Sequence, residues 1–390
     1  MIRFEEALKI VIENAPALRG ERVDILASSG RVLLENVCSD INMPPFNRSA
    51  VDGFACRRGD LGQELTVIET IRAGQAPEKT LGPGQCSRIM TGSPVPEGAD
   101  CVVMVEDTID ISENRIRFTG NHTKDNISRF AEDVREGDLV IEAGTMIRPQ
   151  HIAIMAAVGY VNPLVATRPK VAVISTGDEI VEPQLKPGIS QIRNSNGYQL
   201  VEQIRKADAL PDYLGIAPDN EKATLDKILL AMEGNDVVLL TGGVSMGTFD
   251  FVPSVMEKAG ITILFRKIAL QPGRPTIFGK KDDKLIFGLP GNPVSSFTLF
   301  EVLVKPMLWK MMGVIDFYSI LRLPMGTDYE RRRSDRMQWL PVSIRDGKVF
   351  PLEYHGSAHI FSLASADAIA AIPFGVTKLN IGDLIDVRPL

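Results

Sequence analysis

The sequence predicts a multidomain protein that combines an α/β domain with β-rich domains. The chain has 390 residues, and one domain usually holds roughly 100 to 200, so two to four domains are expected. Residues 23–140 contain short alternating apolar stretches between turn residues, which is typical of a β-rich domain. Residues 168–313 alternate strand patterns with helical patterns, which predicts a parallel sheet joined by right-handed crossovers.

The composition is that of an ordinary globular protein, and it disfavours nucleic acid and membranes as partners. Lys and Arg number 43 against 49 Asp and Glu, and the net charge of −6 opposes nonspecific binding to nucleic acid or anionic membranes. No uncharged apolar run reaches the about 20 residues that a membrane helix needs. The four cysteines form no C-x-x-C pair, which favours a reducing compartment. We therefore expect a cytoplasmic protein in which local features bind any anionic substrate.

The chain begins with an expected amphipathic helix that ends near residues 14–16. Its apolar stripe follows helical spacing and consists of Phe4, Ala7, Leu8, Val11, Ile12 and Ala15. A second helix is expected over 149–158, where it can pack on the first. Residues 1–22 and 141–167 are thus assigned to one helical region, which flanks the β-rich domain at 23–140.

Residues 168–313 carry the elements of the α/β domain. Strand patterns occur at 170–175, 212–216, 236–240, 261–268 and 285–289. Helical patterns occur at 197–207, 220–232, 251–259 and 293–312. Asn292 and Pro293 stand at the N-cap and first position of the last helix. After residue 313 short strands return, with a hairpin turn at 345–347, so residues 314–390 are predicted to form a second β-rich module.

Three of the expected strands end in unusual loops, at 175–179, 241–250 and 288–296. Ligands of an open parallel sheet bind beyond the carboxyl ends of its strands. Small residues and glycines there let backbone N–H groups and helix N-termini approach a phosphate. A single loop of this kind is more often only a tight turn, but three within one segment favour an anion site.

Acidic residues lie beside these loops. Asp178, Glu179, Asp219 and Asp250 would repel a phosphate unless a divalent cation lay between them. Mg²⁺ suits such a site because it takes one or two carboxylates together with substrate phosphates. The pattern therefore predicts a metal-assisted reaction, with exposed helix-capping acids as the alternative for Asp178 and Asp219.

Two further segments are rich in functional residue types. Residues 266–275 hold Arg266, Lys267 and Arg274 between two prolines, and Lys267 and Arg274 could clamp an oxyanion. Residues 42–55 are too polar and proline-rich for a strand and too apolar for a linker, which predicts an ordered loop.

Six motifs in this order resemble the molybdopterin molybdenumtransferases, the MoeA type that also forms the E domain of gephyrin. They read NMPPFNRSAVDGFACR, IMTGSPVPEGADCVVMVED, ISTGDEIV, TGGVSMGTFDF, LQPGRPTIFGK and FGLPGNPVSSF, and the likeness spans nearly the whole chain. It implies a homodimer whose chain has a helical region, an inserted β domain, a molybdopterin-binding α/β domain and a C-terminal β-barrel. It also implies the reaction, in which adenylylated molybdopterin and molybdate give molybdenum cofactor and AMP with Mg²⁺. A molybdopterin adenylyltransferase is the protein partner that this likeness suggests.

The resemblance also implies residue roles. Four acids match catalytic positions, and Asp250 and Glu179 among them match the metal ligands; the four are Asp52, Asp219, Asp250 and Glu179. The other positions that the resemblance matches, taken as substrate-binding, are Thr91, Asp133, Gly242, Gly243, Ser245, Lys267, Pro290, Gly291 and Asn292. The first loop and the cationic segment add the candidates Ser175, Thr176, Gln271 and Arg274.

The sequence departs from the family pattern at three positions. Gln271 replaces a common Lys, Arg274 replaces another, and Ala131 stands where Gly is usual. The loss of one cation at Gln271 predicts weaker molybdate binding. Two alternatives follow: a gephyrin-like scaffold or weakly active paralogue that binds molybdopterin and a partner protein, and a nucleotide-cleaving enzyme of the CinA type. The retained acids favour the transferase over the scaffold, and the region at 23–140 argues against the CinA type.

Overall fold

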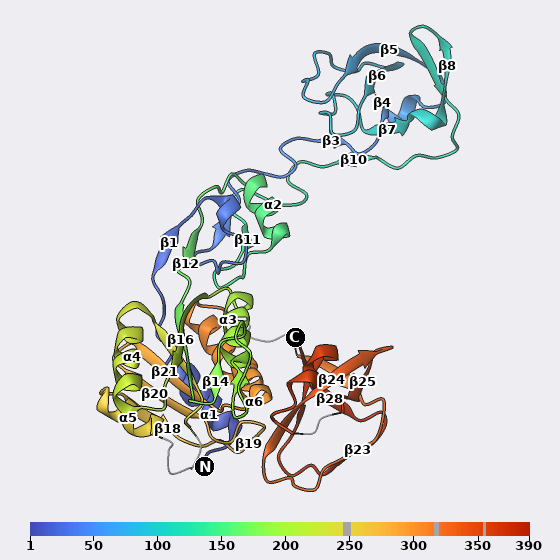
Figure 1. Cartoon of the computed structure of the whole chain (residues 1–390). Helices are drawn as coiled ribbons and strands as arrows, with labels where there is room; N and C mark the ends of the chain where they lie inside the picture. Colours follow the sequence, from blue (N-terminus) through green and yellow to red (C-terminus); the bar gives the residue numbers. More distant parts are fainter. Residues whose placement is uncertain (245–250, 316–319, 354–355) are drawn as a thin grey trace. The chain divides into compact units, whose positions relative to one another are not determined.

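A computed structural model describes residues 1–244, 251–315, 320–353 and 356–390 (Figure 1). These residues form two compact units. Unit 1 consists of Met1–Glu35, Ala143–Arg148 and Asn162–Leu390, and unit 2 consists of Asn36–Glu142 and Pro149–Val161. No helix in the described part of the chain is both long and apolar enough to cross a membrane. The four-domain division expected from the sequence stays a prediction.

Unit 2 is built on a six-stranded sheet. Its strands are β4 (Gly53–Cys56), β5 (Glu64–Ile71), β6 (Gln85–Ile89), β7 (Cys101–Met104), β8 (Thr108–Ser112) and β9 (Arg115–Phe118). Their order is β7-β4-β6-β5-β9-β8, and only β5 and β6 run parallel. The other elements are β2 (Val37–Cys38), β3 (Arg48–Ser49), η2 (Arg58–Asp60), η3 (Val105–Asp107), β10 (Ile127–Ser128), β11 (Leu139–Ile141) and α2 (Pro149–Ala157). The expected β-rich character of this region is confirmed.

One face of this sheet is closely packed. Its buried cluster contains Phe54, Cys56, Leu65, Cys86, Cys101, Val103 and Ile116. Gly53 begins β4 at a point where a Cβ atom would lie 1.8 Å from the carbonyl oxygen of Val103. Only glycine fits this close approach of two strands, so the backbone next to Asp52 is held in place by the packing of β4 on β7.

Unit 1 contains a six-stranded sheet whose strands are β13 (Lys170–Thr176), β16 (Leu210–Ala217), β17 (Val237–Thr241), β18 (Thr262–Phe265), β20 (Ile277–Lys281) and β21 (Lys284–Leu289). The order is β16-β13-β17-β21-β20-β18. The first four are parallel, as predicted, but β20 is antiparallel to both of its neighbours. The prediction of a purely parallel sheet is therefore wrong for β20, because its two-residue connection to β21 makes a hairpin and is too short for a crossover.

Helices cover both faces of this sheet (Figure 1). Val171 and Val173 of β13 lie in one buried cluster, and Ala172 and Ile174 lie in the other, as alternating side chains require. The first face carries α1 (Phe4–Glu13), α3 (Ser195–Lys206), α6 (Pro293–Leu299), the π-helical η4 (Phe300–Val304) and α7 (Lys305–Met311). The second face carries α4 (Glu221–Gly234) and α5 (Val252–Lys258).

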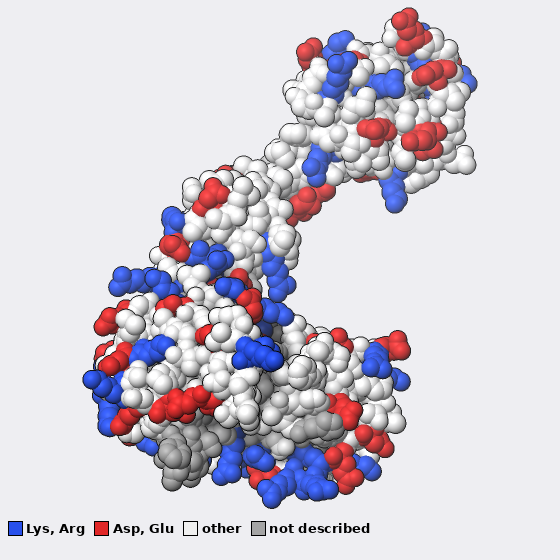
Figure 2. Space-filling view, viewed as in Figure 1, with Lys and Arg blue, Asp and Glu red and all other residues white. Residues whose placement is uncertain are grey.

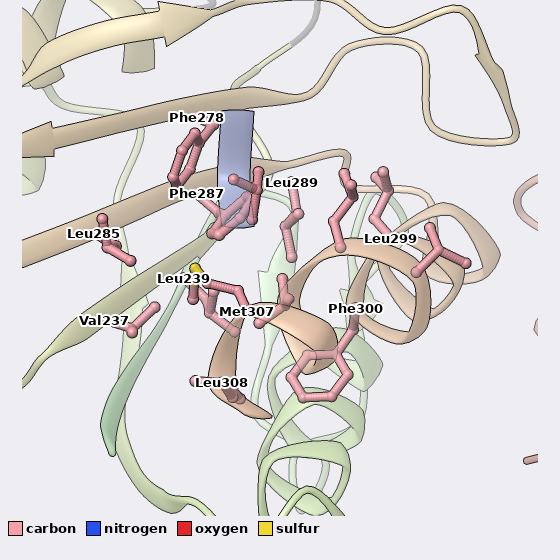
Figure 3. Packing of buried hydrophobic residues seen from close by; sticks show 14 of the residues in the cluster. Val237, Leu239, Phe278, Leu285, Phe287, Leu289, Leu299, Phe300, Met307 and Leu308 are labelled. Carbon is pink, nitrogen blue, oxygen red and sulfur yellow. The ribbon is translucent and has the colours of Figure 1, made fainter. Parts of the chain in front are cut away.

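The first face holds the larger core. Figure 3 shows Phe300, Met307 and Leu308 packed beneath strand residues such as Leu239 and Phe287. The apolar stripe of α1 is buried in the same cluster through Phe4, Ala7 and Val11. The stripe of α1 thus meets the α/β sheet, where the sequence-based expectation was a contact with the helix at 149–158.

The chain ends in a second sheet within unit 1. Its strands are β19 (Leu270–Gln271), β22 (Leu321–Pro324), β24 (Met337–Arg345), β25 (Lys348–Pro351), β26 (Ala368–Ile372) and β28 (Leu384–Pro389). The order is β19-β24-β26-β28-β22, with β25 paired to β24. The predicted hairpin turn is confirmed, since Asp346 and Gly347 have φ values of 48° and 70°. Closure of this module into a barrel stays a prediction.

Short elements complete unit 1. They are β1 (Gly20–Arg22), η1 (Ile25–Ala27), β12 (Leu164–Ala166), β14 (Ile180–Val181), β15 (Ile192–Arg193), β23 (Tyr329–Glu330), η5 (Ile360–Ser365) and β27 (Lys378–Leu379). Acidic and basic side chains are interspersed over the visible surface (Figure 2), in keeping with a small net charge.

Candidate functional site

The carboxyl ends of the parallel strands form one edge of the sheet in unit 1, which we call the rim. Register places Ser175 beside Thr241, and Thr241 beside Leu289. The loops that follow β13, β17 and β21 therefore leave the sheet side by side, as the sequence predicted. Two of the predicted site residues, Ser245 and Asp250, lie outside the described residues.

Hydrogen bonds join the described parts of these loops. The Gly242 amide donates to the Leu289 carbonyl over 3.1 Å, and the Thr176 hydroxyl lies 3.5 Å from the Thr241 carbonyl. Gly242 has φ +103°, and a Cβ atom there would lie 2.4 Å from the Thr176 carbonyl oxygen. Only glycine allows the loop after β17 to cross β13 this closely. Gly243 also has a positive φ, of 62°.

The third loop exposes backbone at its tip. Pro290 is buried, whereas Gly291 and Asn292 are exposed. Asn292 occupies the N-cap position of α6, as predicted, but its side chain makes no capping bond to the helix. The Asn292 side-chain amide instead donates to the Ser357 hydroxyl over 2.7 Å. The Val294 backbone N–H donates to the Ser357 carbonyl over 3.0 Å. Sequence reasoning missed Ser357, which lies 65 residues further along the chain.

Three of the predicted acids at the rim, Asp178, Glu179 and Asp219, are exposed. Asp178 accepts a hydrogen bond from the Asp219 amide over 3.0 Å, so these two loops meet. The Glu179 carboxylate folds over Gly177, where an added Cβ would lie 2.4 Å from its Oε2 atom. No group of three or more metal-ligating side chains occurs within the described ranges. Exposed single carboxylates still fit Mg²⁺, which keeps several waters and takes one or two carboxylates.

The predicted cationic segment begins and ends at the same edge of the sheet. Phe265 of β18 pairs with Phe278, and Ile277 of β20 pairs with Gly288, so residues 266–276 connect two strand ends there. Lys267 is held through its carbonyl, which accepts from the Ile2 amide over 3.2 Å. Gln271 belongs to β19 and is half-buried.

Of the cations in this segment, Arg266 and Arg274 are exposed and Lys267 is half-buried. Arg266 forms an ion pair with Glu257. Both partners are more than half exposed, so this ion pair is weak and Arg266 stays a candidate for the cation that the chain lacks at Gln271.

Three of the predicted site residues, Asp52, Thr91 and Asp133, lie in unit 2. Asp52 accepts hydrogen bonds from the Thr91 amide over 2.6 Å and from the Thr91 hydroxyl over 2.9 Å. The backbone bond first, and the hydroxyl bond second, hold the pKa of Asp52 below its ordinary value. Asp133 is exposed, and its amide donates to the Met43 carbonyl over 3.0 Å. The structure thus brings Asp52 and Thr91 together.

Thr91→Val is expected to raise the pKa of Asp52, because it removes one of the two bonds that stabilise the carboxylate. The depressed pKa contributes stability that is present above the unfolded pKa and is lost as the pH falls through the folded pKa. In the variant the folded pKa lies closer to the unfolded one, so this contribution is smaller and its loss is complete at a higher pH. Carboxyl ¹³C NMR titration measures the shift, and Thr91→Ser, which keeps the hydroxyl, is the matched control. Identical titration of the Val and Ser variants would contradict the assignment.

Sequence reasoning also missed a chain of hydrogen bonds that runs from the buried Ser175, behind the rim, to the exposed Tyr198. The Ser175 hydroxyl donates to Asn194 over 3.0 Å, and the Asn194 amide donates to the Tyr213 hydroxyl over 2.8 Å. Tyr213 and Tyr198 both donate to the carboxylate of Glu182, over 2.8 and 3.0 Å. Burial, and then the Glu182 carboxylate, raise the pKa of Tyr213. The sequence signal for this chain was the Asn-x-Asn-Gly run at 194–197, which directly precedes a helical pattern.

Comparison with known proteins places the chain in a family. Residues 2–159 match the MoeA N-terminal region (domain I and II), residues 172–310 match a probable molybdopterin binding domain, and residues 324–390 match the MoeA C-terminal region (domain IV). Together these regions cover nearly the whole chain.

Full-length relatives agree with these matches. The molybdopterin molybdenumtransferase of Bacillus subtilis is 36% identical, with 99% of this chain and 93% of the relative covered. That of Staphylococcus epidermidis is 34% identical, with 99% and 95% covered. The crystal structure of the molybdopterin biosynthesis MoeA protein of Pyrococcus horikoshii superposes with a TM-score of 0.86 at 28% identity, with 100% of both chains covered. The chain therefore belongs to the MoeA family of molybdopterin molybdenumtransferases, enzymes of molybdenum cofactor biosynthesis.

Proposed function

We propose that this chain inserts molybdenum into adenylylated molybdopterin, hydrolyses the adenylate and releases molybdenum cofactor and AMP. The observation that carries the proposal is the side-by-side exit of the loops after β13, β17 and β21 at one edge of the sheet. The loops offer small residues or exposed backbone, and Asp178 and Glu179 lie in the first of them, which suits the pyrophosphate of such a substrate together with a divalent cation. Its family membership supplies the reaction class.

The substrate roles divide by chemistry. Gly243, Gly291 and Asn292 would face the phosphates and pterin with backbone N–H groups. Gly242, whose own N–H group donates to Leu289, would let the backbone of this loop approach the substrate. Ser245, Pro290, Ser175 and Thr176 would line the same site. Lys267, Gln271 and Arg274 would hold the molybdate oxyanion, since cationic donors form the stronger bonds to an anion. In unit 2, Asp52 is the proposed catalytic carboxylate, and Thr91 and Asp133 are the proposed substrate-binding residues.

Mg²⁺ is the proposed metal, with Asp250 and Glu179 as its ligands and Asp219 beside them. When bound, the metal would offset negative charge on the pyrophosphate. Glu179 is available for this role because its carboxylate is exposed at the end of β13. Asp219 is held next to the same loop by the bond from its amide to Asp178.

Further features are proposed from the family likeness. We propose a cytoplasmic homodimer with a four-domain chain that ends in a β-barrel, and a molybdopterin adenylyltransferase as partner. The scaffold alternative has no comparable support, since the relatives compared above are named as transferases.

Incubation of the purified chain with adenylylated molybdopterin, Mg²⁺ and molybdate tests the proposal. We expect AMP and active cofactor to appear in equal amounts, and omission of Mg²⁺ or of molybdate to prevent this. Tight binding of molybdopterin without AMP release would favour the scaffold or a weakly active paralogue.

Gln271→Lys is expected to lower the molybdate concentration that gives half-maximal cofactor formation, by about three- to tenfold. A charged hydrogen bond to the oxyanion exceeds a neutral one by on the order of 1 kcal/mol. Gln271→Met, which adds no charge, is the control of similar length. Equal half-maximal concentrations for the Lys variant and the wild type would show that Arg266 or Arg274 already supplies the missing charge.

A further inference from the structure

One short segment at the start of α3, residues 194–197, contacts all three loops of the rim. Asn194 accepts from the Ser175 hydroxyl at the end of β13, over 3.0 Å. Asn196 donates to the Thr241 hydroxyl at the end of β17 over 2.9 Å, and to the Gly291 carbonyl beyond β21 over 2.8 Å. The segment therefore spans three neighbouring strand ends in their order in the sheet.

The direction of these hydrogen bonds is fixed by chemistry. The Gly291 carbonyl can only accept, so the Asn196 atom that faces it must be Nδ2. The same nitrogen donates to Thr241, whose hydroxyl in turn donates to the Pro290 carbonyl over 3.3 Å. Asn196 is 8% exposed, and its Oδ1 atom has no hydrogen-bond partner in the described part of the chain. All of the side chain's hydrogen bonds to described residues are thus made by its NH₂ group.

We propose that Asn196 is a positioning residue for the substrate, and that its NH₂ group sets the spacing between the loop at 241–243 and the loop at 290–292. The proposal rests on the proposed function for the identity of the ligand. Asn196 joins the two loops because its NH₂ group donates to both the Thr241 hydroxyl and the Gly291 carbonyl. The direct bond between Gly242 and Leu289 joins the strand ends and does not reach the tip at Gly291. Without Asn196 the Gly291 carbonyl loses its partner, and the tip of the loop can move.

The effect is expected on binding more than on folding. A carbonyl that loses its buried hydrogen-bond partner changes the equilibrium between the native and a rearranged loop by roughly tenfold to hundredfold. A small misplacement of groups that bind the substrate has an effect of similar size on the complex. Asn196→Ala should therefore weaken binding of adenylylated molybdopterin about tenfold or more. Asn196→Asp should do the same, because a carboxylate keeps the shape and the oxygen but has no donor for Gly291.

Asn235→Ala is the matched control. Asn235 is 3% exposed and also donates twice, to Asp212 over 2.9 Å and to the Ala231 carbonyl over 3.1 Å. It precedes β17, at the amino end of the strands and away from the rim. Both Ala variants should lose similar thermal stability, but only Asn196→Ala should lose affinity when adenylylated molybdopterin is titrated calorimetrically without Mg²⁺ or molybdate. Equal affinities of the two variants would overturn the proposal.

Hydrogen exchange of the ligand-free proteins provides a second readout that does not need the proposed substrate. Segments 241–244 and 288–294 should exchange faster in Asn196→Ala than in the wild type or in Asn235→Ala. Unchanged exchange there would overturn the proposal, whereas failure of the wild type to bind the substrate would count against the proposed function alone.

If Asn196→Ala does not fold, Thr241→Val provides the test. It removes the bond between Asn196 and the Thr241 hydroxyl, one of the two that Asn196 donates, within a strand that tolerates valine. It should weaken binding severalfold, and wild-type affinity would again be contrary to the proposal.

Discussion

Gly242→Ala is expected to lower AMP release about a hundredfold or more while the rest of the chain stays folded. The residue has φ +103°, which an L-amino acid with a side chain rarely adopts, and its added Cβ would lie 2.4 Å from the Thr176 carbonyl oxygen. The obstructing atom belongs to the backbone of β13 and cannot rotate away. The loop must therefore shift, which moves the backbone N–H groups that we assign to the phosphates.

Gly234→Ala is the matched control for this variant. Gly234 is the last residue of α4, has ordinary backbone angles, and has no atom within 4 Å of an added Cβ. Alanine there should keep full activity and add up to about 1 kcal/mol of stability. AMP release and thermal unfolding of both variants are compared with the wild type. Wild-type turnover in Gly242→Ala would exclude this loop from the site.

Asp250→Asn is expected to reduce AMP release roughly a hundredfold to a thousandfold, because the variant removes a hard anionic ligand from the proposed Mg²⁺. The argument comes from the sequence, since Asp250 lies outside the described residues and follows the glycine-rich loop directly. The amide has nearly the same shape, so the fold should persist. The rate is measured over a range of Mg²⁺ concentrations.

Asp226→Asn controls for the loss of one negative charge. Asp226 is an exposed carboxylate within α4 and belongs to none of the proposed groups. Its replacement should leave the rate and the Mg²⁺ dependence unchanged. Unchanged turnover of Asp250→Asn at saturating Mg²⁺ would remove that residue from the metal site.

The rim could be predicted because its elements carry local signals. Buried-strand patterns place the ends of β13, β17 and β21, and parallel strands must expose those ends at one edge. The glycine at 242 also has a local cause, namely its positive φ. The hairpin of β20 and β21 was missed because residues 277–281 carry no turn signal strong enough to separate them from the preceding cationic segment.

The polar residues behind the rim depend on tertiary structure. Asn196 acquires its role only when α3 packs across three strand ends, and its partners lie 45 and 95 residues away along the chain. Ser357 reaches Asn292 from 65 residues further along in the same way. A periodic pattern reports which face of an element is buried, but it does not report which distant loop a polar side chain will meet.

A crystal structure of the chain with adenylylated molybdopterin, prepared without Mg²⁺ or molybdate so that the substrate is not consumed, tests the central claim most directly. We predict that the pyrophosphate lies against the backbone N–H groups of Gly243 and Gly291 at the rim, beyond the ends of β17 and β21. Well-defined substrate bound elsewhere, with these groups still facing water, would contradict the assignment of the rim as the substrate site.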